Sequence, residues 1–329
     1  MTRVALCGVG NIGKVHLGNL RSLRGCEVSG IYSLQTAELE KLAAANGVLA
    51  YPNANAMFSD PAVDAVIIAS PSDTHRALVE QALAAGKHVF VEKPLADTLE
   101  DAQAIVTAAE RHPDRVVQVG FCERFNAQYI EAKNSARAGS LGRVRCLHSS
   151  RVAPYGLGNP AWQLGALDTA VHNLDLILWL LEEMPVRVFA RGVQIYPQSK
   201  MQHSITSLLE FASGALVTDT VTWLADAAHP LSKCARSRMH LMGETGSFEI
   251  DLSARPSALL TSTEYREVDT VLLGGEAYYG CLKLQFEAFL RSVEEGVPVL
   301  APVSDAYRAE QVVLHIQKSL QTGAPVEIV

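Results

Sequence analysis

Three glycines near the amino terminus constrain the fold of this chain more than any other feature. Gly8, Gly10 and Gly13 have the spacing G-x-G-x-x-G, which follows an apolar run at residues 3–7 and precedes a predicted helix at residues 12–23. In such a strand–turn–helix unit, the first glycine permits the tight turn, the second lets the backbone approach a pyrophosphate, and the third lets the helix pack closely on the strand. The glycines alone are weak evidence, because a plain βα turn also uses them, but their place between a strand and a helix predicts a dinucleotide site. The predicted cofactor contacts of this turn are Gly8, Gly10, Asn11, Ile12 and Gly13.

Strands and helices alternate along residues 1–122. Short apolar runs predict buried strands, and apolar residues three and four positions apart predict helices. The predicted strands are residues 3–7, 28–32, 65–69, 88–91 and 116–120, and the predicted helices are residues 12–23, 37–46, 74–85 and 99–111. Thr98 is expected to cap the last of these helices. The alternation predicts an α/β fold with a doubly wound parallel sheet, which is a Rossmann-type dinucleotide-binding domain at residues 1–122.

The pattern changes in residues 123–329, which are predicted to form a second domain. Alternating and β-rich segments replace the strand–helix repeat there, which indicates a largely antiparallel sheet. The predicted strands are residues 143–151, 186–195, 204–211, 215–223, 237–242 and 247–252, and the predicted helices are residues 127–138, 167–181, 281–294 and 304–321. Residues 154–166 are rich in Gly and Pro and are expected to form a loop.

Charge, apolar content and cysteines narrow the class of protein. The net charge is -7 and Lys and Arg do not cluster, which argues against nucleic-acid binding. The apolar runs are too short to span a bilayer, so no membrane association is predicted. None of the six cysteines forms a C-x-x-C pair or lies near a His at zinc-ligand spacing, so they are interpreted as reduced thiols. The glycine motif begins at residue 8 and leaves no room for a removable leader, so a cytoplasmic protein is expected.

The end of the second predicted strand bears on the choice of cofactor. An NAD site often carries an acidic residue there for the ribose 2′-hydroxyl, whereas an Arg nearby accommodates the 2′-phosphate of NADP. This chain has Ser33 with no Arg after it, and Ser33 can also be an ordinary loop residue. Glu38 and Glu40 lie close in sequence and would disfavour the extra charge of NADP if they turned inward. NAD and NADP both stay open, with a slight preference for NAD.

The loops after the third and the fourth predicted strand are expected to border the cofactor crevice, because the carboxyl ends of parallel strands share one edge. Ser70, Pro71 and His75 follow the third strand. His75 either touches the ribose of the cofactor or is a capped surface histidine.

Glu92, Lys93 and Pro94 follow the fourth predicted strand. A Lys at the carboxyl end of a central strand points into the crevice, and Pro94 restricts Lys93 to extended backbone. An amine held there can hydrogen-bond a substrate oxygen and stabilise developing alkoxide charge. The plain alternative is a solvated Lys before a turn.

Asp168 and His172 are four residues apart on the predicted helix at residues 167–181, so they share one of its faces. An imidazole suits a proton acceptor or donor near neutral pH, and a nearby carboxylate can orient it or bind a substrate hydroxyl. The alternative is a dipole-favoured Asp168 at a helix N-terminus and a core histidine at position 172. A metal site that includes Asp175 is not favoured, because no further ligands cluster in sequence.

Four aromatic residues lie near Gly-rich loops, namely Tyr155, Trp162, Tyr278 and Tyr279. They can stack on the apolar faces of a sugar ring, although core packing is the default explanation for each.

Taken in order, these motifs resemble the glucose–fructose oxidoreductase/inositol dehydrogenase (Gfo/Idh/MocA) family almost from end to end. Lys93 in its Glu-Lys-Pro setting and the pair Asp168 and His172 are the specific part of the resemblance. The other matching segments are residues 8–13, 70–75, 120–125, 172–175, 243–247 and 322–326. The chain departs from the family pattern at Ser33, and at Cys122 and Glu123, where many members have Asn and a basic residue.

The resemblance implies an N-terminal Rossmann domain and a C-terminal α/β domain with an open, mostly antiparallel sheet. It also implies an active site at the junction of the domains, with oligomers, a homodimer or homotetramer, built through the exposed face of that sheet. The family's roles carry over to Lys93, Asp168 and His172. The predicted cofactor contacts beyond the glycine turn are Ser33, Ser70, Pro71, His75, Glu92, Lys93 and Pro94, and the predicted substrate contacts are Lys93, Arg124, Tyr155, Trp162, Asp168 and His172.

The predicted function is therefore hydride transfer between NAD or NADP and a secondary hydroxyl or carbonyl of a cyclic polyol, such as an inositol, or of a sugar. His172 is the predicted general base, Lys93 stabilises the developing charge, and Asp168 binds a substrate hydroxyl. Two alternatives stay open. Some relatives hold NAD tightly and cleave glycosides without net redox change, and a non-catalytic, cofactor-dependent binding protein would keep the fold alone.

Overall fold

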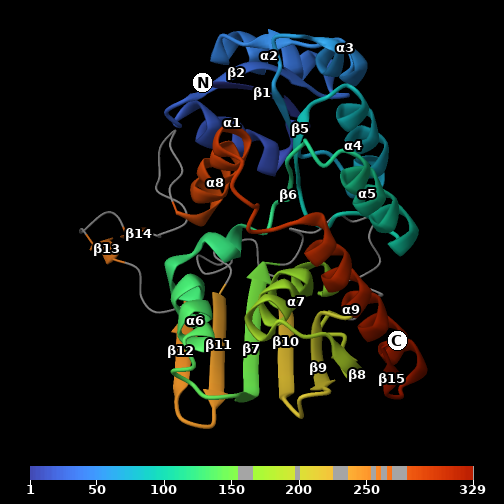
Figure 1. Cartoon of the computed structure of the whole chain (residues 1–329), viewed down its shortest axis with the longest axis vertical. Coiled ribbons are helices and arrows are strands. Elements are labelled where there is room, and N and C mark those ends of the chain that lie inside the picture. The colour runs from blue at the N-terminus through green and yellow to red at the C-terminus, as the bar shows by residue number, and fades with distance from the viewer. Residues whose placement is uncertain are drawn as a thin grey trace. The chain divides into compact units, whose positions relative to one another are not determined.

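The computed structural model describes residues 1–154, 166–196, 201–224, 236–252, 257–260, 265–268 and 280–328. Contacts divide the chain into two compact units (Figure 1). The first unit comprises Met1–Asn126 and Ser257–Tyr307, and the second comprises Ala127–Pro256 and Arg308–Val329. The sequence-based boundary between residues 122 and 123 stays a prediction.

The first unit is built on a six-stranded sheet. Its strands are β1 (Thr2–Cys7), β2 (Cys26–Tyr32), β3 (Leu49–Ala50), β4 (Ala65–Ile68), β5 (His88–Val91) and β6 (Val117–Val119). All the described strand pairs of this sheet are parallel, and the spatial order is β3-β2-β1-β4-β5-β6. The order reverses between β1 and β4, and such a switch point opens a crevice at the carboxyl ends of the strands. The predicted doubly wound sheet is confirmed.

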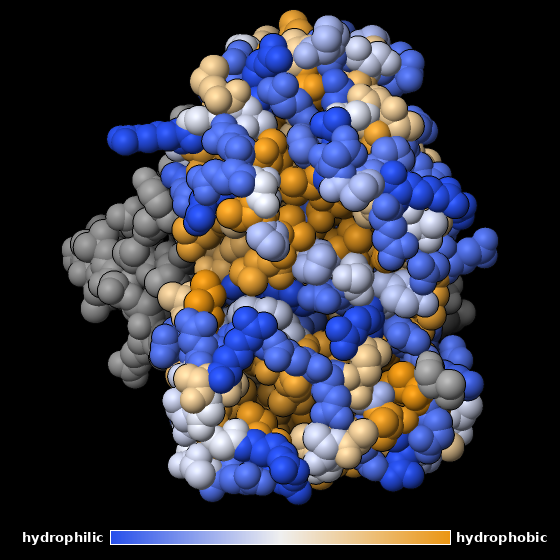
Figure 2. Space-filling view, in the orientation of Figure 1, coloured by the Kyte–Doolittle hydropathy of each residue, from blue (hydrophilic) through white to orange (hydrophobic). Residues whose placement is uncertain are grey.

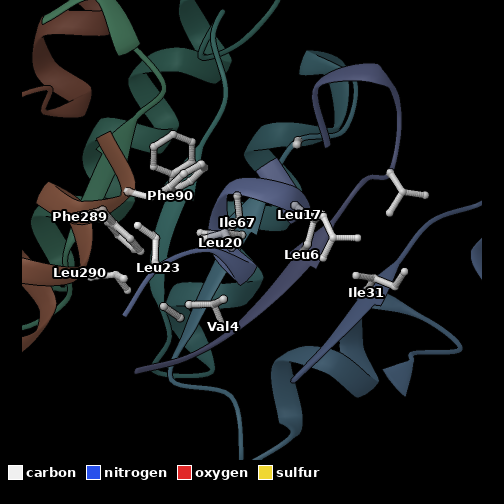
Figure 3. Packing of buried hydrophobic residues seen from close by; sticks show 14 of the residues in the cluster. Val4, Leu6, Leu17, Leu20, Leu23, Ile31, Ile67, Phe90, Phe289 and Leu290 are labelled. Atoms are coloured by element: carbon white, nitrogen blue, oxygen red, sulfur yellow. The ribbon is translucent and has the colours of Figure 1, made fainter. Parts of the chain in front are cut away.

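Helices cover both faces of this sheet. They are α1 (Asn11–Arg21), α2 (Thr36–Asn46), α3 (Ala54–Ser59), α4 (His75–Ala84), α5 (Leu99–Arg111) and α8 (Cys281–Glu295), with the 3-10 turns η1 (Ser72–Thr74) and η2 (Cys122–Phe125). Helix α8 packs on α1 and β1 although it comes late in the sequence. Leu20 of α1, Ile67 of β4 and Phe289 of α8 belong to one buried apolar cluster (Figure 3). On the other side, α4 contacts β4, β5 and α5.

The second unit is built on a seven-stranded sheet with the order β12-β11-β7-β10-β9-β8-β15. Its strands are β7 (Val144–Pro154), β8 (Pro185–Val193), β9 (Ser204–Phe211), β10 (Leu216–Leu224), β11 (Arg236–Gly243), β12 (Ser247–Asp251) and β15 (Val326–Glu327). Strands β7 and β10 are parallel and the other pairs are antiparallel, so the predicted mostly antiparallel sheet is confirmed.

Two helices of the second unit, α6 (Ala127–Arg137) and α7 (Leu167–Leu181), lie on one side of this sheet (Figure 1). Helix α7 contacts β7 and β10, and α6 contacts β12. Alternate residues of β10, such as Val217, Asp219 and Val221, are buried, which is the period of a strand with one covered face. Helix α9 (Val303–Thr322) begins in the first unit and continues into the second.

Several short elements were not predicted. Helix α3 has six residues, too few to show a helical period, and it starts where the Asn53 side chain accepts a hydrogen bond from the Ala56 amide at 2.8 Å. Strands β3 and β15 have two residues each, and β13 (Ser257–Leu260) and β14 (Tyr265–Val268) form a separate pair. The helix predicted from residue 74 begins with the turn η1 and becomes α-helical at His75. In the described part of the chain, no helix combines the length and apolarity needed to cross a membrane.

Candidate active site

The glycine turn depends on backbone contacts that leave no room for side chains. Gly8 has φ +100°, and a Cβ atom there would lie 2.4 Å from the carbonyl oxygen of Ala69, which follows β4. A Cβ atom on Gly13 would lie 2.1 Å from the carbonyl oxygen of Gly8. Glycine at these positions therefore lets the end of β1, the start of α1 and the end of β4 meet at the switch point of the sheet.

The N-terminus of α1 is arranged to receive an anion. Gly10 is its N-cap, none of the described side chains caps the helix, and its first turn contains no acidic residue. A Cβ atom on Gly10 would meet nothing within 4 Å, so the space in front of this glycine is open. The first amide groups of the helix, from Asn11 and Ile12 onward, have no partners within it and carry the positive end of the helix dipole. These residues fit the pyrophosphate of a dinucleotide.

Ser33 follows β2 and is half-buried, and its hydroxyl accepts a hydrogen bond from the Gln35 amide at 3.3 Å. Glu38 forms an ion pair with Lys14 of α1, while Glu40 is exposed. The charge of Lys14 offsets that of Glu38, which weakens the argument that Glu38 would disfavour NADP.

His75 connects two loops at the carboxyl edge of the sheet. Its side chain is 1% exposed, with Nε2 3.0 Å from the carbonyl oxygen of Ser70 and Nδ1 3.1 Å from that of Leu95. Burial lowers the pKa of His75 in spite of these carbonyls, so the ring is neutral and donates to one of them at a time. The interpretation of His75 as a surface histidine is therefore wrong. Pro71 precedes the turn η1, and the Ser70 hydroxyl lies 2.7 Å from that of Thr74.

Glu92, Lys93 and Pro94 follow β5, as predicted. Lys93 is half-buried, and the Lys93–Pro94 peptide bond is cis. The Glu92 side chain, which the sequence assigned to the cofactor, is buried, and its carboxylate lies 2.6 Å from Nε2 of His16. Sequence reasoning missed His16. The available signal was its place three residues after Gly13, on the face of α1 that packs on the sheet.

Arg124 lies in η2 with 1% of its side chain exposed. Its Nη1 donates hydrogen bonds to the carboxylate of Asp305 at 2.8 Å and to the carbonyl oxygen of Leu300 at 2.7 Å. This connection between η2 and the start of α9 was not anticipated by its predicted role as a substrate contact. The neighbouring Cys122 hydrogen-bonds Cys281, and that bond together with burial raises the pKa of the Cys122 thiol well above its usual value.

Helix α7 has the predicted bounds and carries both Asp168 and His172, whose spacing places them on one face. Asp168 is buried and lies in the first turn, while His172 is partly exposed. The Trp223 indole of β10 donates a hydrogen bond to the Thr169 hydroxyl at 2.7 Å, which fixes the start of the helix on the sheet. Among the described residues, no group of three or more His, Cys, Asp or Glu side chains is placed to hold a metal ion.

A buried polar chain holds α7 to the sheet next to His172, and sequence reasoning missed it. The Arg151 guanidinium donates to Asn173 Oδ1 at 2.7 Å, and the Asn173 amide donates to Asp219 Oδ1 at 2.7 Å. Burial raises the pKa of Asp219 to about 6, although the Asn173 bond and the charge of Arg151 act in the opposite direction. These residues come from β7, α7 and β10, so no local pattern in the sequence connects them.

A cleft of about 510 Å³ lies elsewhere on the first unit. It is lined by the ends of α5 and α8, by residues 297–299 and 302–304, and by His88 and Val116 near the amino ends of β5 and β6. Figure 2 shows hydrophobic residues gathered on the surface between α5 and α8. Because the glycine turn is at the carboxyl edge of the same sheet, this cleft is separate from the candidate site.

The structure brings the glycine turn, Ser33, Ser70 and Lys93 to one edge of the first unit, and it places Asp168 and His172 on one helix of the second unit. The predicted aromatic contacts Tyr155, Trp162, Tyr278 and Tyr279 lie outside the described residues, so their roles stay predictions.

Two family models match the sequence. One, described as an oxidoreductase family with an NAD-binding Rossmann fold, matches residues 2–121, and the other, described as the GFO/IDH/MocA C-terminal domain, matches residues 129–249. The chain belongs to the Gfo/Idh/MocA family. The predicted resemblance is thereby confirmed, as is the prediction of an oxidoreductase with an NAD-binding fold.

Proteins similar to this Gfo/Idh/MocA chain include inositol dehydrogenases. Inositol 2-dehydrogenase 1 of Saccharopolyspora erythraea is 29% identical over 334 aligned positions, which cover 99% of this chain and 96% of that protein. Inositol 2-dehydrogenase of Acidothermus cellulolyticus is 35% identical over 182 positions, which cover 55% of this chain and 53% of that protein. The structure of scyllo-inositol dehydrogenase from Lactobacillus casei with bound NAD(H) and scyllo-inositol has a TM-score of 0.85 at 21% identity, with 99% of both chains covered. That structure shows a shared fold.

Two substitutions separate the packing role of the glycine turn from its binding role. Gly13→Ala is expected to lower the free energy of unfolding by about 1–3 kcal/mol or more, because its methyl group meets a backbone oxygen that cannot move aside. Gly10→Ala is expected to change it by less than about 0.5 kcal/mol but to weaken NADH binding, since its methyl group occupies the approach of the pyrophosphate. Urea unfolding and NADH fluorescence titration measure the two effects. Wild-type NADH affinity in Gly10→Ala would contradict the assignment of the anion site.

Asp219→Asn tests the buried chain beneath α7 through the pH dependence of stability. The pKa of Asp219 is raised on folding, so the native state binds more protons than the unfolded state, and wild-type stability falls as pH rises through about 6. The wild type is expected to lose about 1–2 kcal/mol relative to Asp219→Asn between pH 5 and pH 8. Chemical unfolding of both proteins across this range measures the difference. A stability difference that does not vary with pH would show that Asp219 keeps an ordinary pKa.

Proposed function

We propose that this chain catalyses reversible oxidation of a secondary hydroxyl on a cyclic polyol, such as an inositol, or on a sugar. The observation that carries the proposal is that one edge of the parallel sheet holds both the open N-terminus of α1 and Lys93 at the end of β5. An anion site and an amine at the same edge of the sheet suit a reaction in which a dinucleotide is bound beside a hydroxyl. The full-length likeness to a protein named inositol 2-dehydrogenase supports this substrate class.

Three side chains have proposed catalytic roles. His172 takes the proton from the substrate hydroxyl as a general base. Lys93 donates a hydrogen bond to the same oxygen and stabilises its developing negative charge. Asp168 binds a substrate hydroxyl and so orients the ring. The nicotinamide, when bound, supplies the hydride acceptor.

The proposed cofactor is NAD or NADP, with a slight preference for NAD. Family membership supports dinucleotide binding, and the residue after β2 is Ser33, which is neither an acid for the 2′-hydroxyl nor an Arg for the 2′-phosphate. The proposed cofactor contacts are Gly8, Gly10, Asn11, Ile12, Gly13, Ser33, Ser70, Pro71, His75, Glu92, Lys93 and Pro94. Arg124, Tyr155 and Trp162 stay proposed contacts of the substrate.

We also propose a homodimer or homotetramer that forms through the face of the seven-stranded sheet opposite α6 and α7. Three pairs of polar side chains bridge neighbouring strands on that face: His148–Thr218 at 2.6 Å, Ser204–Thr222 at 2.8 Å and Thr206–Thr220 at 3.1 Å. None of these six residues is buried.

We also propose a cytoplasmic location. Five cysteines of the described residues are free thiols, which supports it: Cys7, Cys26, Cys122, Cys146 and Cys281.

The function is tested by nicotinamide absorbance with a panel of inositols, sugars and sugar acids, each supplied with NAD⁺ and with NADP⁺. Reduction of one dinucleotide with at least one polyol or sugar is the expected result. The dinucleotide that is reduced also decides between NAD and NADP, the choice that Ser33 leaves open. Lys93→Met should lower kcat by about 100-fold or more, because it removes a donor to the reacting oxygen. Its NADH affinity should stay nearly intact, because the dinucleotide keeps its other proposed contacts. The exposed Lys41→Met is the matched control.

Two results would contradict the proposal. Full activity of Lys93→Met would remove this residue from the mechanism. If the protein binds NADH but reduces neither dinucleotide with any compound of the panel, redox-neutral glycoside cleavage or a non-catalytic binding role would be favoured instead.

A further inference from the structure

The Glu92 carboxylate is shared between α1 and the backbone of Lys93. Its Oε1 lies 2.6 Å from Nε2 of His16, and its Oε2 accepts a hydrogen bond from the Lys93 amide at 3.0 Å. The His16 side chain is 0% exposed and that of Glu92 is 9% exposed. Removing two such polar groups from water is unfavourable unless each satisfies the other, so the contact is a strong constraint on both elements.

The surroundings fix the position of this pair. A Cβ atom on Gly120, which follows β6, would lie 2.8 Å from Glu92 Oε1, so glycine makes room for the carboxylate. The His16 ring packs edge-on against Phe286 at 4.8 Å between centroids and against Phe90 at 6.0 Å. The imidazole therefore has one orientation in an apolar enclosure, with Nε2 directed at the carboxylate.

The charge state of the pair follows from its contacts. Burial by itself raises the pKa of Glu92, but the hydrogen bond from His16 and the charges of His16 and Lys93 outweigh burial and hold that pKa below its usual value. Glu92 is therefore ionised at neutral pH. An ionised carboxylate can only accept, so Nε2 of His16 carries a hydrogen and donates a hydrogen bond to Glu92 Oε1.

We propose that His16 and Glu92 are positioning residues that fix Lys93 relative to the dinucleotide-binding helix α1. His16 lies between one and two helical turns after Gly10, the N-cap of α1, whose open N-terminus is the candidate anion site, and Glu92 holds the backbone of the proposed catalytic lysine. A rigid connection of this kind keeps the Lys93 amine in register with a cofactor held by α1. The inference rests on the proposed function for the role of Lys93, but the connection itself can be tested without a substrate.

A double-mutant cycle in kcat separates positioning from simple loss of stability. Glu92→Ala is expected to lower kcat by about 100-fold, the scale of a misplacement near 1 Å, with the KM of the polyol little changed. Glu92→Gln keeps an acceptor for the Lys93 amide and should restore most of the activity. In the Lys93→Met background, Glu92→Ala should cause no further loss, because its effect acts through the lysine. The exposed Glu100→Ala is the matched control.

The proposal would be overturned if the double variant lost kcat by the product of the two single-variant factors. It would also be overturned if Glu92→Ala kept the wild-type kcat. If Glu92→Ala does not fold, His16→Phe takes its place in the cycle, since it removes the donor but keeps a ring between Phe90 and Phe286.

Acylation of Lys93 by a lysine-reactive ester, followed by peptide mass spectrometry, tests the connection independently of turnover. Release of the backbone in Glu92→Ala, or in its His16→Phe replacement, should change the labelling rate of Lys93 severalfold, while that of the exposed Lys41 stays constant. An unchanged Lys93 rate would overturn the positioning role even if the enzyme oxidises polyols. A wild-type protein that oxidises nothing in the panel, yet shows the changed rate, would refute the proposed function and leave the connection standing.

Discussion

The close backbone approach at Gly8 and Gly13 is the constraint on which the candidate site depends. Carbonyl oxygens of Ala69 and Gly8 occupy the space where side chains at these two positions would lie. This contact aims the N-terminus of α1 at the crevice beside the switch point between β1 and β4. The remaining site residues of the first unit follow from it, because the loops after β2, β4 and β5 end at the same edge of the parallel sheet.

Buried polar contacts fix the positions of site elements that the glycine turn does not determine. In the first unit, Glu92 connects His16 of α1 to the backbone of Lys93. In the second unit, Asn173 connects α7 to Asp219 of β10, next to His172. Each contact is costly to leave unsatisfied, so each one specifies a single arrangement of the element that carries a proposed catalytic residue.

Local patterns in the sequence predict the bounds of an element correctly where that element is long and regular. Helices α5 and α7 have the predicted bounds because their apolar residues repeat over three or more turns, and Thr98 caps α5 as expected. Helix α3 is too short to show such a period. His16 and Asp219 escaped notice for a different reason. Their partners, Glu92 and Asn173, come from distant parts of the chain and meet only in the folded structure.

The proposed hydride transfer can be followed as the movement of deuterium from the carbinol carbon of a polyol to the nicotinamide. The protein is incubated with the oxidised dinucleotide and an inositol that is deuterated at its ring carbons, and the reduced dinucleotide is analysed by mass spectrometry. Direct hydride transfer places one deuterium in each reduced nicotinamide, which requires the two reacting carbons to be held together. An oxidised product that forms while the reduced nicotinamide stays unlabelled would contradict direct hydride transfer and with it the proposed site.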